Sequence, residues 1–187
     1  MTSTIESIRA EYLRYKALAE AAIAQVEDAD LSKRSSGADN SIAIICWHVS
    51  GNLESRFTDF LTSDGEKPWR NREEEFQPRT ATRAELLAKW NQGWEVVLQS
   101  LSDLKDEDLQ RTVTIRRQSL QINEALHRSL AHLAYHVGQI VYIGKLLRGK
   151  DWHFLSIPPG QSDAYNRAPA SEAASIHARK LADRSKS

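Results

Sequence analysis

The stretch from residue 123 to residue 147, NEALHRSLAHLAYHVGQIVYIGKLL, constrains the fold more than any other part of the chain. It contains no proline, and Asn123 is a residue type that often caps the start of a helix. Its apolar residues recur at helical spacing, so the predicted helix has one broad apolar face that must be buried against other elements. These residues are Leu126, Leu130, Leu133, Val137, Ile140, Val141 and Ile143.

The same face carries His132 and His136. Four residues turn a helix by about 400°, so the two rings lie about 40° apart and one turn above each other. Two imidazoles at this spacing can bind one metal ion together. Most such pairs are ordinary core or surface histidines, so a metal site requires a third ligand on another helix.

Length and charge limit the classes of protein to consider. The 187 residues suit one domain over residues 1–187. Lys+Arg and Asp+Glu both number 25, and zero net charge disfavours a nucleic-acid binder with a basic surface. No apolar run reaches membrane-spanning length, and the first residues lack a secretory-signal pattern. We therefore expect a cytoplasmic protein that binds neither nucleic acid nor membrane.

Three further stretches have helical periodicity and complete the predicted fold. Residues 63–76 form a long charged loop between the second and third predicted helices, where Trp69 and Phe76 are expected to anchor the loop. The four helices predict an all-α fold, a four-helix bundle over about residues 4–148 with at least one crossover connection. The three further helices are predicted at residues 4–28, from Asn40 or Ser41 to about Thr62, and from about Thr82 to Leu101.

Two segments depart from the helical period. Residues 108–122 alternate apolar and polar side chains and are rich in β-branched types, which predicts a short hairpin or extended crossover turning at residues 116–119. Residues 149–187 form a C-terminal arm, since Pro158 and Pro159 forbid a helix around them. Residues 170–184 could form a last polar helix.

His48 supplies the third candidate ligand, because it lies in the apolar first half of the second predicted helix. Helical bundles build metal sites from inward-facing side chains on opposed helices. Three imidazoles around one divalent ion leave a position open for water or substrate, as reactive sites require. His48, His132 and His136 are therefore the candidate ligands of a metal site, and from these patterns alone ordinary core or surface histidines explain them equally well.

Asn52 and Arg56 follow His48 by one and two helical turns, near the same face. Polar groups inside a buried stripe are costly unless they have partners. They could hydrogen-bond to their surroundings, hold His48 or contact a substrate, and a solvent-facing helix side would explain them equally well. They are the candidate substrate-binding residues, and no catalytic residue is identified.

Other known motifs fit less well. A zinc-protease motif needs a glutamate where this chain has Leu133. A di-iron bundle needs two Glu-x-x-His motifs and two more glutamates, but Glu124 and His127 form the one such motif found. His127 lies about 140° around the helix from His132, so we expect it to be exposed. We also expect His153 and His177 at the surface and Cys46 as a buried, inert thiol.

Two segments carry a family resemblance: CWHVSGNLESRFTDFLTSDGEKPWRNREEEF and LAHLAYHVGQIVYIGKLLRGKDWHFLSIPPGQS. Over about residues 5–165 the chain resembles the DinB/YfiT-like superfamily of metal-binding four-helix bundles, in a branch of domains of unknown function. The resemblance implies up-down-down-up helix order, a homodimer, and nickel or zinc on His48, His132 and His136. Some relatives are thiol-dependent transferases or isomerases.

Three functions remain open from the sequence. The first is a metal-dependent enzyme that holds a low-molecular-weight thiol as the thiolate, with Arg56 anchoring a carboxylate of the thiol or of the small-molecule substrate that accepts it. The second is a hydrolase using metal-bound water, although the nearest acid on the His48 face, Asp59, is about three turns away. The third is a non-catalytic binding protein stabilised by its metal.

Overall fold

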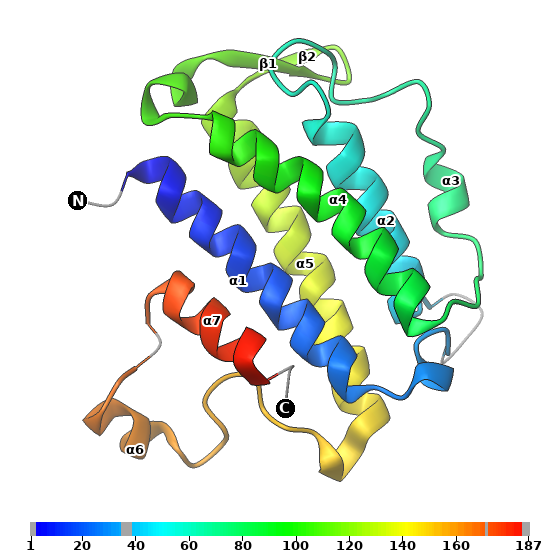
Figure 1. The fold of residues 1–187 in the computed structure, drawn as a ribbon, viewed down its shortest axis with the longest axis vertical. Helices are drawn as coiled ribbons and strands as arrows, with labels where there is room; N and C mark the ends of the chain where they lie inside the picture. The colour runs from blue at the N-terminus through cyan, green and yellow to red at the C-terminus, as the bar shows by residue number, and fades with distance from the viewer. Residues whose placement is uncertain (1–2, 35–38, 171, 185–187) are drawn as a thin grey trace.

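A computed structural model describes residues 3–34, 39–170 and 172–184 of the chain. Over these residues the protein is mostly helical, as expected, with one small two-stranded sheet. Four long helices lie side by side, and α1 and α5 run away from the sheet while α2 and α4 run toward it (Figure 1). They are α1 (Thr4–Gln25), α2 (Ile42–Phe57), α4 (Arg83–Asp103) and α5 (Ile122–Arg148).

Side-chain caps determine where two of these helices begin. A capping box begins α4: Thr82 Oγ1 accepts the Glu85 N–H at 3.3 Å, and the Glu85 carboxylate accepts the Thr82 N–H at 2.8 Å. The predicted cap of α5, Asn123, is wrong. The N-cap is instead Gln121, two residues earlier, at the end of the preceding strand, and the carboxylate of Glu124 accepts the N–H of Gln121 at 2.8 Å.

The first two helices end before their predicted limits. The chain is extended at Val26, just after α1, although the apolar period continues through this residue. Likewise α2 ends at Phe57, and Asp59 lies beyond it with φ of 49°. Helical spacing therefore does not place Asp59 on the His48 face.

The interface between α2 and α4 is very close at one point. A Cβ placed at Gly93 of α4 would lie 2.7 Å from Ser50 Cα of α2. Trp90 and Trp94 of α4 are fully buried, and Tyr12 of α1 lies beside Trp94. The Tyr12 hydroxyl donates to the carbonyl of Leu126 at 3.0 Å. Burial of these large rings joins α1, α4 and α5 in one core.

The predicted hairpin is confirmed as β1 (Thr112–Ile115) paired antiparallel with β2 (Gln118–Gln121). Its turn residues, Arg116 and Arg117, have φ of 53° and 61°, in the left-handed region that favours glycine. The Asp64 carboxylate accepts the backbone N–H groups of both, at 2.8 and 2.7 Å. These bonds hold the turn against the loop that follows α2.

The loop between α2 and α4 contains a short helix, α3 (Arg72–Glu75), that the sequence did not predict. Trp69 does not anchor this loop, because its side chain is 56% exposed. The buried side chains are instead Lys67 and Glu75, with Arg70. Phe76 does pack inward, with its ring centroid 4.4 Å from that of His48.

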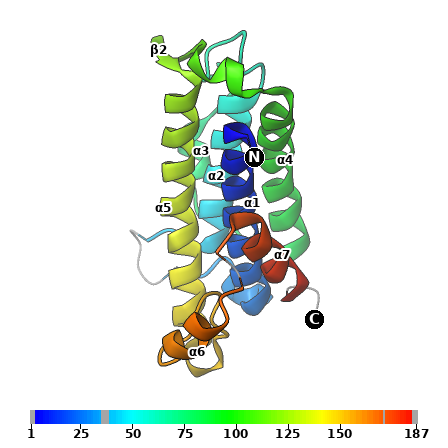
Figure 2. The ribbon, with the colours of Figure 1, turned by 90° about the vertical axis from the view of Figure 1, so that its left-hand side faces the viewer.

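The C-terminal arm contains α6 (Ser162–Arg167) and α7 (Ala174–Arg184). The sequence allowed a last polar helix within residues 170–184, and α7 forms there and packs along α1 with Leu181 buried. The hairpin and α6 lie at opposite ends of the long helices (Figure 2). Among the described residues, no helix combines the length and apolarity needed to cross a membrane.

Candidate metal centre

Three histidines from two helices meet in the structure, as predicted. Nε2 of His132 lies 3.3 Å from Nε2 of His48 and 3.1 Å from Nε2 of His136. One ligand atom from each residue lies within 4.8 Å of the other two. Zinc–imidazole bonds of about 2.0–2.1 Å in a tetrahedral site place nitrogens about 3.3 Å apart. The arrangement is thus compatible with one shared metal ion.

The helix positions explain why these rings converge. His48 and His136 are buried, and His132 is half-buried. On α5, Leu133 and Val137 are buried beside them and fix the rotation of the helix about its axis. The one-turn spacing of His132 and His136 on α5 places both rings against the ring of His48 on α2.

A hydrogen bond at Nδ1, the ring nitrogen away from the cluster, fixes the orientation of both His48 and His136. His48 Nδ1 donates to Glu75 Oε2 at 2.8 Å, and His136 Nδ1 donates to Gln139 Oε1 at 3.0 Å. Donation from Nδ1 leaves the Nε2 lone pair of each ring free to face the cluster, as in metal-ligating histidines. Gln139 could have been predicted as the partner of His136, because it follows His136 by three residues on the same helix. No spacing in the sequence indicates that Glu75 is the partner of His48.

Glu75 is itself fixed by a buried arginine. Arg70 Nε donates to Glu75 Oε1 at 2.7 Å, and Arg70 Nη2 donates to Oε2 at 2.9 Å. Burial acts to raise the pKa of Glu75, but the hydrogen bonds from Arg70 and His48 outweigh it and hold the pKa below its usual range. Glu75 is therefore an ionised acceptor for His48 at neutral pH.

Gly51 provides the space for this carboxylate. A Cβ at Gly51 would lie 2.8 Å from Glu75 Cδ and closer still to Oε1. A side chain at this point of α2 would therefore displace the group that orients His48, three residues earlier on the same helix.

Burial favours the neutral form of His132 and His136. Burial lowers the pKa of His132 to about 3, and the neighbouring His136 and His48 rings act in the same direction. Burial also lowers the pKa of His136, although its hydrogen bond with Gln139 opposes this. A neutral imidazole is the form that binds metal.

Replacing Glu75 by glutamine is expected to weaken metal binding about 10- to 100-fold, the usual effect of removing a partner that orients a metal-bound histidine. Gly51→Ala should act in the same direction, because its methyl group would displace the carboxylate. Competition with a chromophoric chelator measures both affinities. Glu73→Gln, a change at an exposed glutamate of the same short helix, is the matched control. Unchanged affinity in the Glu75 variant would contradict the assigned role.

The candidate substrate-binding residues, Asn52 and Arg56, line a cavity of about 200 Å³ together with His48 and His132. Arg56 is also engaged within the protein: its guanidinium contacts the Glu66 carboxylate at 3.1 Å and the carbonyl of Gly65. The sequence thus located both residues at the site but did not predict this ion pair.

The remaining singled-out residues lie elsewhere. His127 and His153 are exposed, as predicted, whereas His177 is half-buried with Nε2 3.0 Å from the carbonyl oxygen of Leu155. His177 is therefore less exposed than predicted, because α7 packs along α1. Cys46 is fully buried, as predicted, and burial raises the pKa of its thiol, which disfavours the reactive thiolate.

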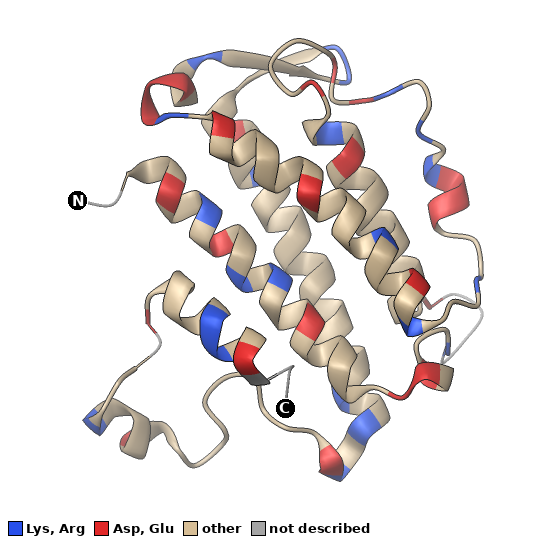
Figure 3. Cartoon of the chain, viewed as in Figure 1, with Lys and Arg blue, Asp and Glu red and all other residues tan. Residues whose placement is uncertain are grey.

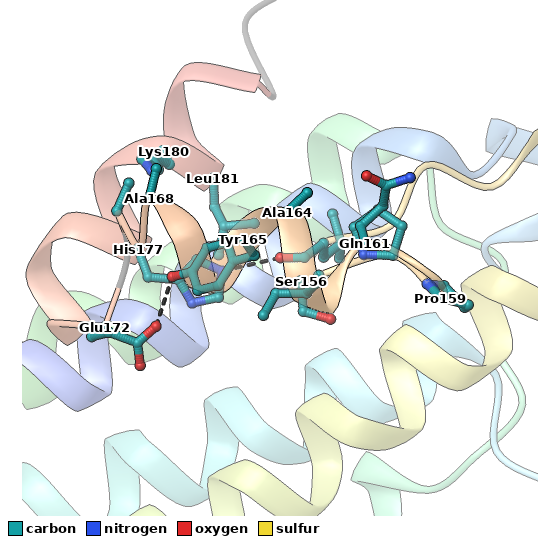
Figure 4. A pocket seen from close by; sticks show the side chains of 14 residues that line it. Ser156, Pro159, Gln161, Ala164, Tyr165, Ala168, Glu172, His177, Lys180 and Leu181 are labelled. Atoms are coloured by element: carbon teal, nitrogen blue, oxygen red, sulfur yellow. Dashed lines mark hydrogen bonds between the residues drawn. The ribbon is translucent and has the colours of Figure 1, made fainter.

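A larger cavity of about 780 Å³ lies in the C-terminal arm (Figure 4). It is lined by side chains between residues 155 and 181, and none of the three clustered histidines belongs to it. At its rim the Tyr165 hydroxyl donates to Glu172 Oε1 at 2.7 Å. The smaller cavity is the one that adjoins the candidate metal centre.

Comparison with known proteins adds a family but no activity. The family model described as "Protein of unknown function (DUF1572)" matches residues 1–161. No curated protein and no solved structure matches the chain.

Proposed function

Because the chain belongs to the DUF1572 family of proteins of unknown function, whose description assigns no activity, we propose a function from the site itself. The protein is a metal-dependent enzyme of the thiol-dependent transferase type. It binds one divalent ion, nickel or zinc, through His48, His132 and His136. Its fold is a DinB-like four-helix bundle in up-down-down-up order, and the helix directions in Figure 1 support this assignment.

The observation that carries the proposal is the hydrogen-bonding state of the three rings. His48 and His136 donate from Nδ1, so both present an Nε2 lone pair to His132 Nε2. The one proton that His132 can place on Nε2 satisfies a single neighbour. A cation at the common point satisfies all three nitrogens at once. The donor set therefore fits a divalent metal better than it fits a hydrogen-bonded core cluster.

The surroundings of the histidines support a reactive site. Three imidazoles leave a coordination position open, and the cavity borders His48 and His132. When bound, the metal would stabilise a thiol as the thiolate, which is the nucleophile in thiol transfer. Asn52 and Arg56 line the same cavity and would orient the thiol or the acceptor. Phe76 packs on the His48 ring from the side of α3.

Hydrolysis by metal-bound water has less support. Such chemistry usually needs a carboxylate base near the open position. Glu75 is the acid at the site, but His48 and Arg70 occupy both of its oxygens. Asp59 lies in the turn beyond α2. A non-catalytic, metal-stabilised binding protein is also less supported, because the cavity reaches the histidines.

We also propose that two copies associate through α5. Tyr135, Tyr142 and Leu146 are spaced by seven and four residues, so they share one helix face, and their exposed fractions are 64%, 63% and 61%. An exposed apolar stripe of this kind is typical of a helix that packs against a partner.

A cobalt-substituted protein tests the transferase proposal. Cysteine, glutathione or bacillithiol is expected to change the visible absorption of the bound cobalt, since a thiolate would occupy the open position. Serine and S-methylcysteine, which cannot supply a thiolate, are the controls and should cause no change. If cobalt binds stoichiometrically and no thiol alters its spectrum, the thiol-dependent function is wrong while the metal site stands.

A further inference from the structure

The cavity beside His48 and His132 has a strongly positive lining. Five arginines and no acidic side chain line it. They come from three separate parts of the chain: the end of α2, the loop and α3 that follow it, and the hairpin turn with the start of α5. Figure 3 shows basic segments along the loop from α2 to α3 and at the hairpin turn. The five are Arg56, Arg70, Arg72, Arg116 and Arg128.

These guanidinium groups outnumber the carboxylates that pair with them. Arg56 and Arg116 share one partner, Glu66, at 3.1 and 2.8 Å. Arg70 pairs with Glu75 and Arg72 with Glu73. Within the part of the chain that the structure describes, Arg128 has no ion-pair partner. The cavity therefore retains positive charge that its own carboxylates do not neutralise.

Arg70 contains the most informative unpaired donor. Its side chain is 2% exposed, and Nε and Nη2 are bonded to Glu75. Its Nη1 is buried and has no hydrogen-bond partner among the described residues. A buried charged donor without an acceptor is costly, so its retention at a cavity points to a ligand that supplies the acceptor.

Arg116 reaches the cavity through an unfavourable backbone conformation. Its φ is 53°, a value that costs energy for a residue with a side chain. Asp64 compensates by accepting its N–H, and Glu66 holds its guanidinium at 2.8 Å. Backbone strain that the surroundings hold in place is characteristic of functional sites.

We infer that this cavity binds an oxyanion, a carboxylate or phosphate group, of a small substrate whose other end lies at the three histidines. The inference rests on the proposed function, because it assigns the bound group to the substrate of that site. Guanidinium groups bind both kinds of oxyanion through charge-assisted hydrogen bonds. The volume of about 200 Å³ is below the roughly 300–1,000 Å³ of pockets for drug-sized ligands, so the molecule is short.

Isothermal titration calorimetry on metal-free protein tests the oxyanion site independently of the metal. Inorganic phosphate and malonate are the two probes, and the tighter binder identifies the kind of oxyanion. Arg128→Gln should weaken binding about tenfold or more, the loss expected for one charged hydrogen bond. Arg9→Gln removes the same charge from an exposed residue of α1 outside the cavity and should bind both probes as the wild type does.

Thermal denaturation of both variants confirms that they fold, and Arg116→Gln serves as a second cavity variant if Arg128→Gln does not. No binding of either probe to the wild type would overturn the inference, and so would an equal loss in the Arg9 variant. Elemental analysis of the protein as purified, before the metal is removed for calorimetry, reports separately on the metal. Probe binding without stoichiometric metal would contradict the proposed metal-dependent enzyme and support the oxyanion site. Stoichiometric metal without probe binding would contradict the oxyanion site and leave the proposed enzyme standing.

Discussion

Replacing either His132 or His136 by alanine is expected to abolish stoichiometric metal binding. Each ring supplies one of three nitrogens around the common point, and two remaining imidazoles bind an ion far more weakly. The measurement is elemental analysis of protein purified without a polyhistidine tag. His127→Ala is the matched control, because its ring lies on the same helix but is exposed and away from the cluster.

The same variants should also lose the stabilisation that the metal provides. Binding to the folded state alone stabilises it by about 2.7 kcal/mol when the ligand is present at 100 times its Kd. Added zinc or nickel should therefore raise the melting temperature of the wild type and of the His127 variant. The variants at His132 and His136 should not respond. Metal content equal to wild type in both of these variants would exclude the site.

Replacing Gly93 by alanine is expected to destabilise the fold strongly. The new Cβ would lie 2.7 Å from Ser50 Cα and Oγ and 2.8 Å from Ser50 O, so α2 and α4 would have to separate. Helix propensity alone would favour alanine by about 1 kcal/mol. Overpacking against a neighbouring backbone typically costs about 1–3 kcal/mol or more. The steric cost therefore outweighs the gain in helix propensity, and the variant is expected to be less stable.

Chemical denaturation monitored by circular dichroism measures this effect as the free energy of unfolding. Glu95→Ala is the control, since this exposed residue of α4 faces away from Ser50 and should change stability by about 0.5 kcal/mol at most. An increase in stability for Gly93→Ala would mean that α2 and α4 do not approach as closely as the structure places them.

Helical spacing was sufficient to locate the three histidines. The period of α5 places His132 and His136 on one face, and the apolar start of α2 requires His48 to point inward. The hairpin was also predictable, because an alternating pattern replaces the helical one between two helices. The direction of each side chain depends on residues close together in the chain, where local geometry relates direction to position, whereas the meeting of His48 with the two histidines of α5 depends on how the helices pack.

The loop between α2 and α4 was predicted poorly because its side chains have no such period. The expectation that Trp69 anchors it followed from apolarity alone, yet charged residues take the buried positions. The hydrogen bond between Glu75 and His48 joins residues 27 apart across irregular backbone. Its energy comes from a network with Arg70 that only the folded chain assembles.

The absence of a side chain at Gly51 has an evolutionary consequence. The space that glycine leaves there is filled by a carboxylate from another segment, so substitutions at positions 51 and 75 cannot be accepted independently. A homologue with alanine at the first position is expected to carry a shorter acid, or none, at the second. We therefore expect positions 51 and 75 to covary among homologues, because both determine how firmly the histidine at position 48 is held in place.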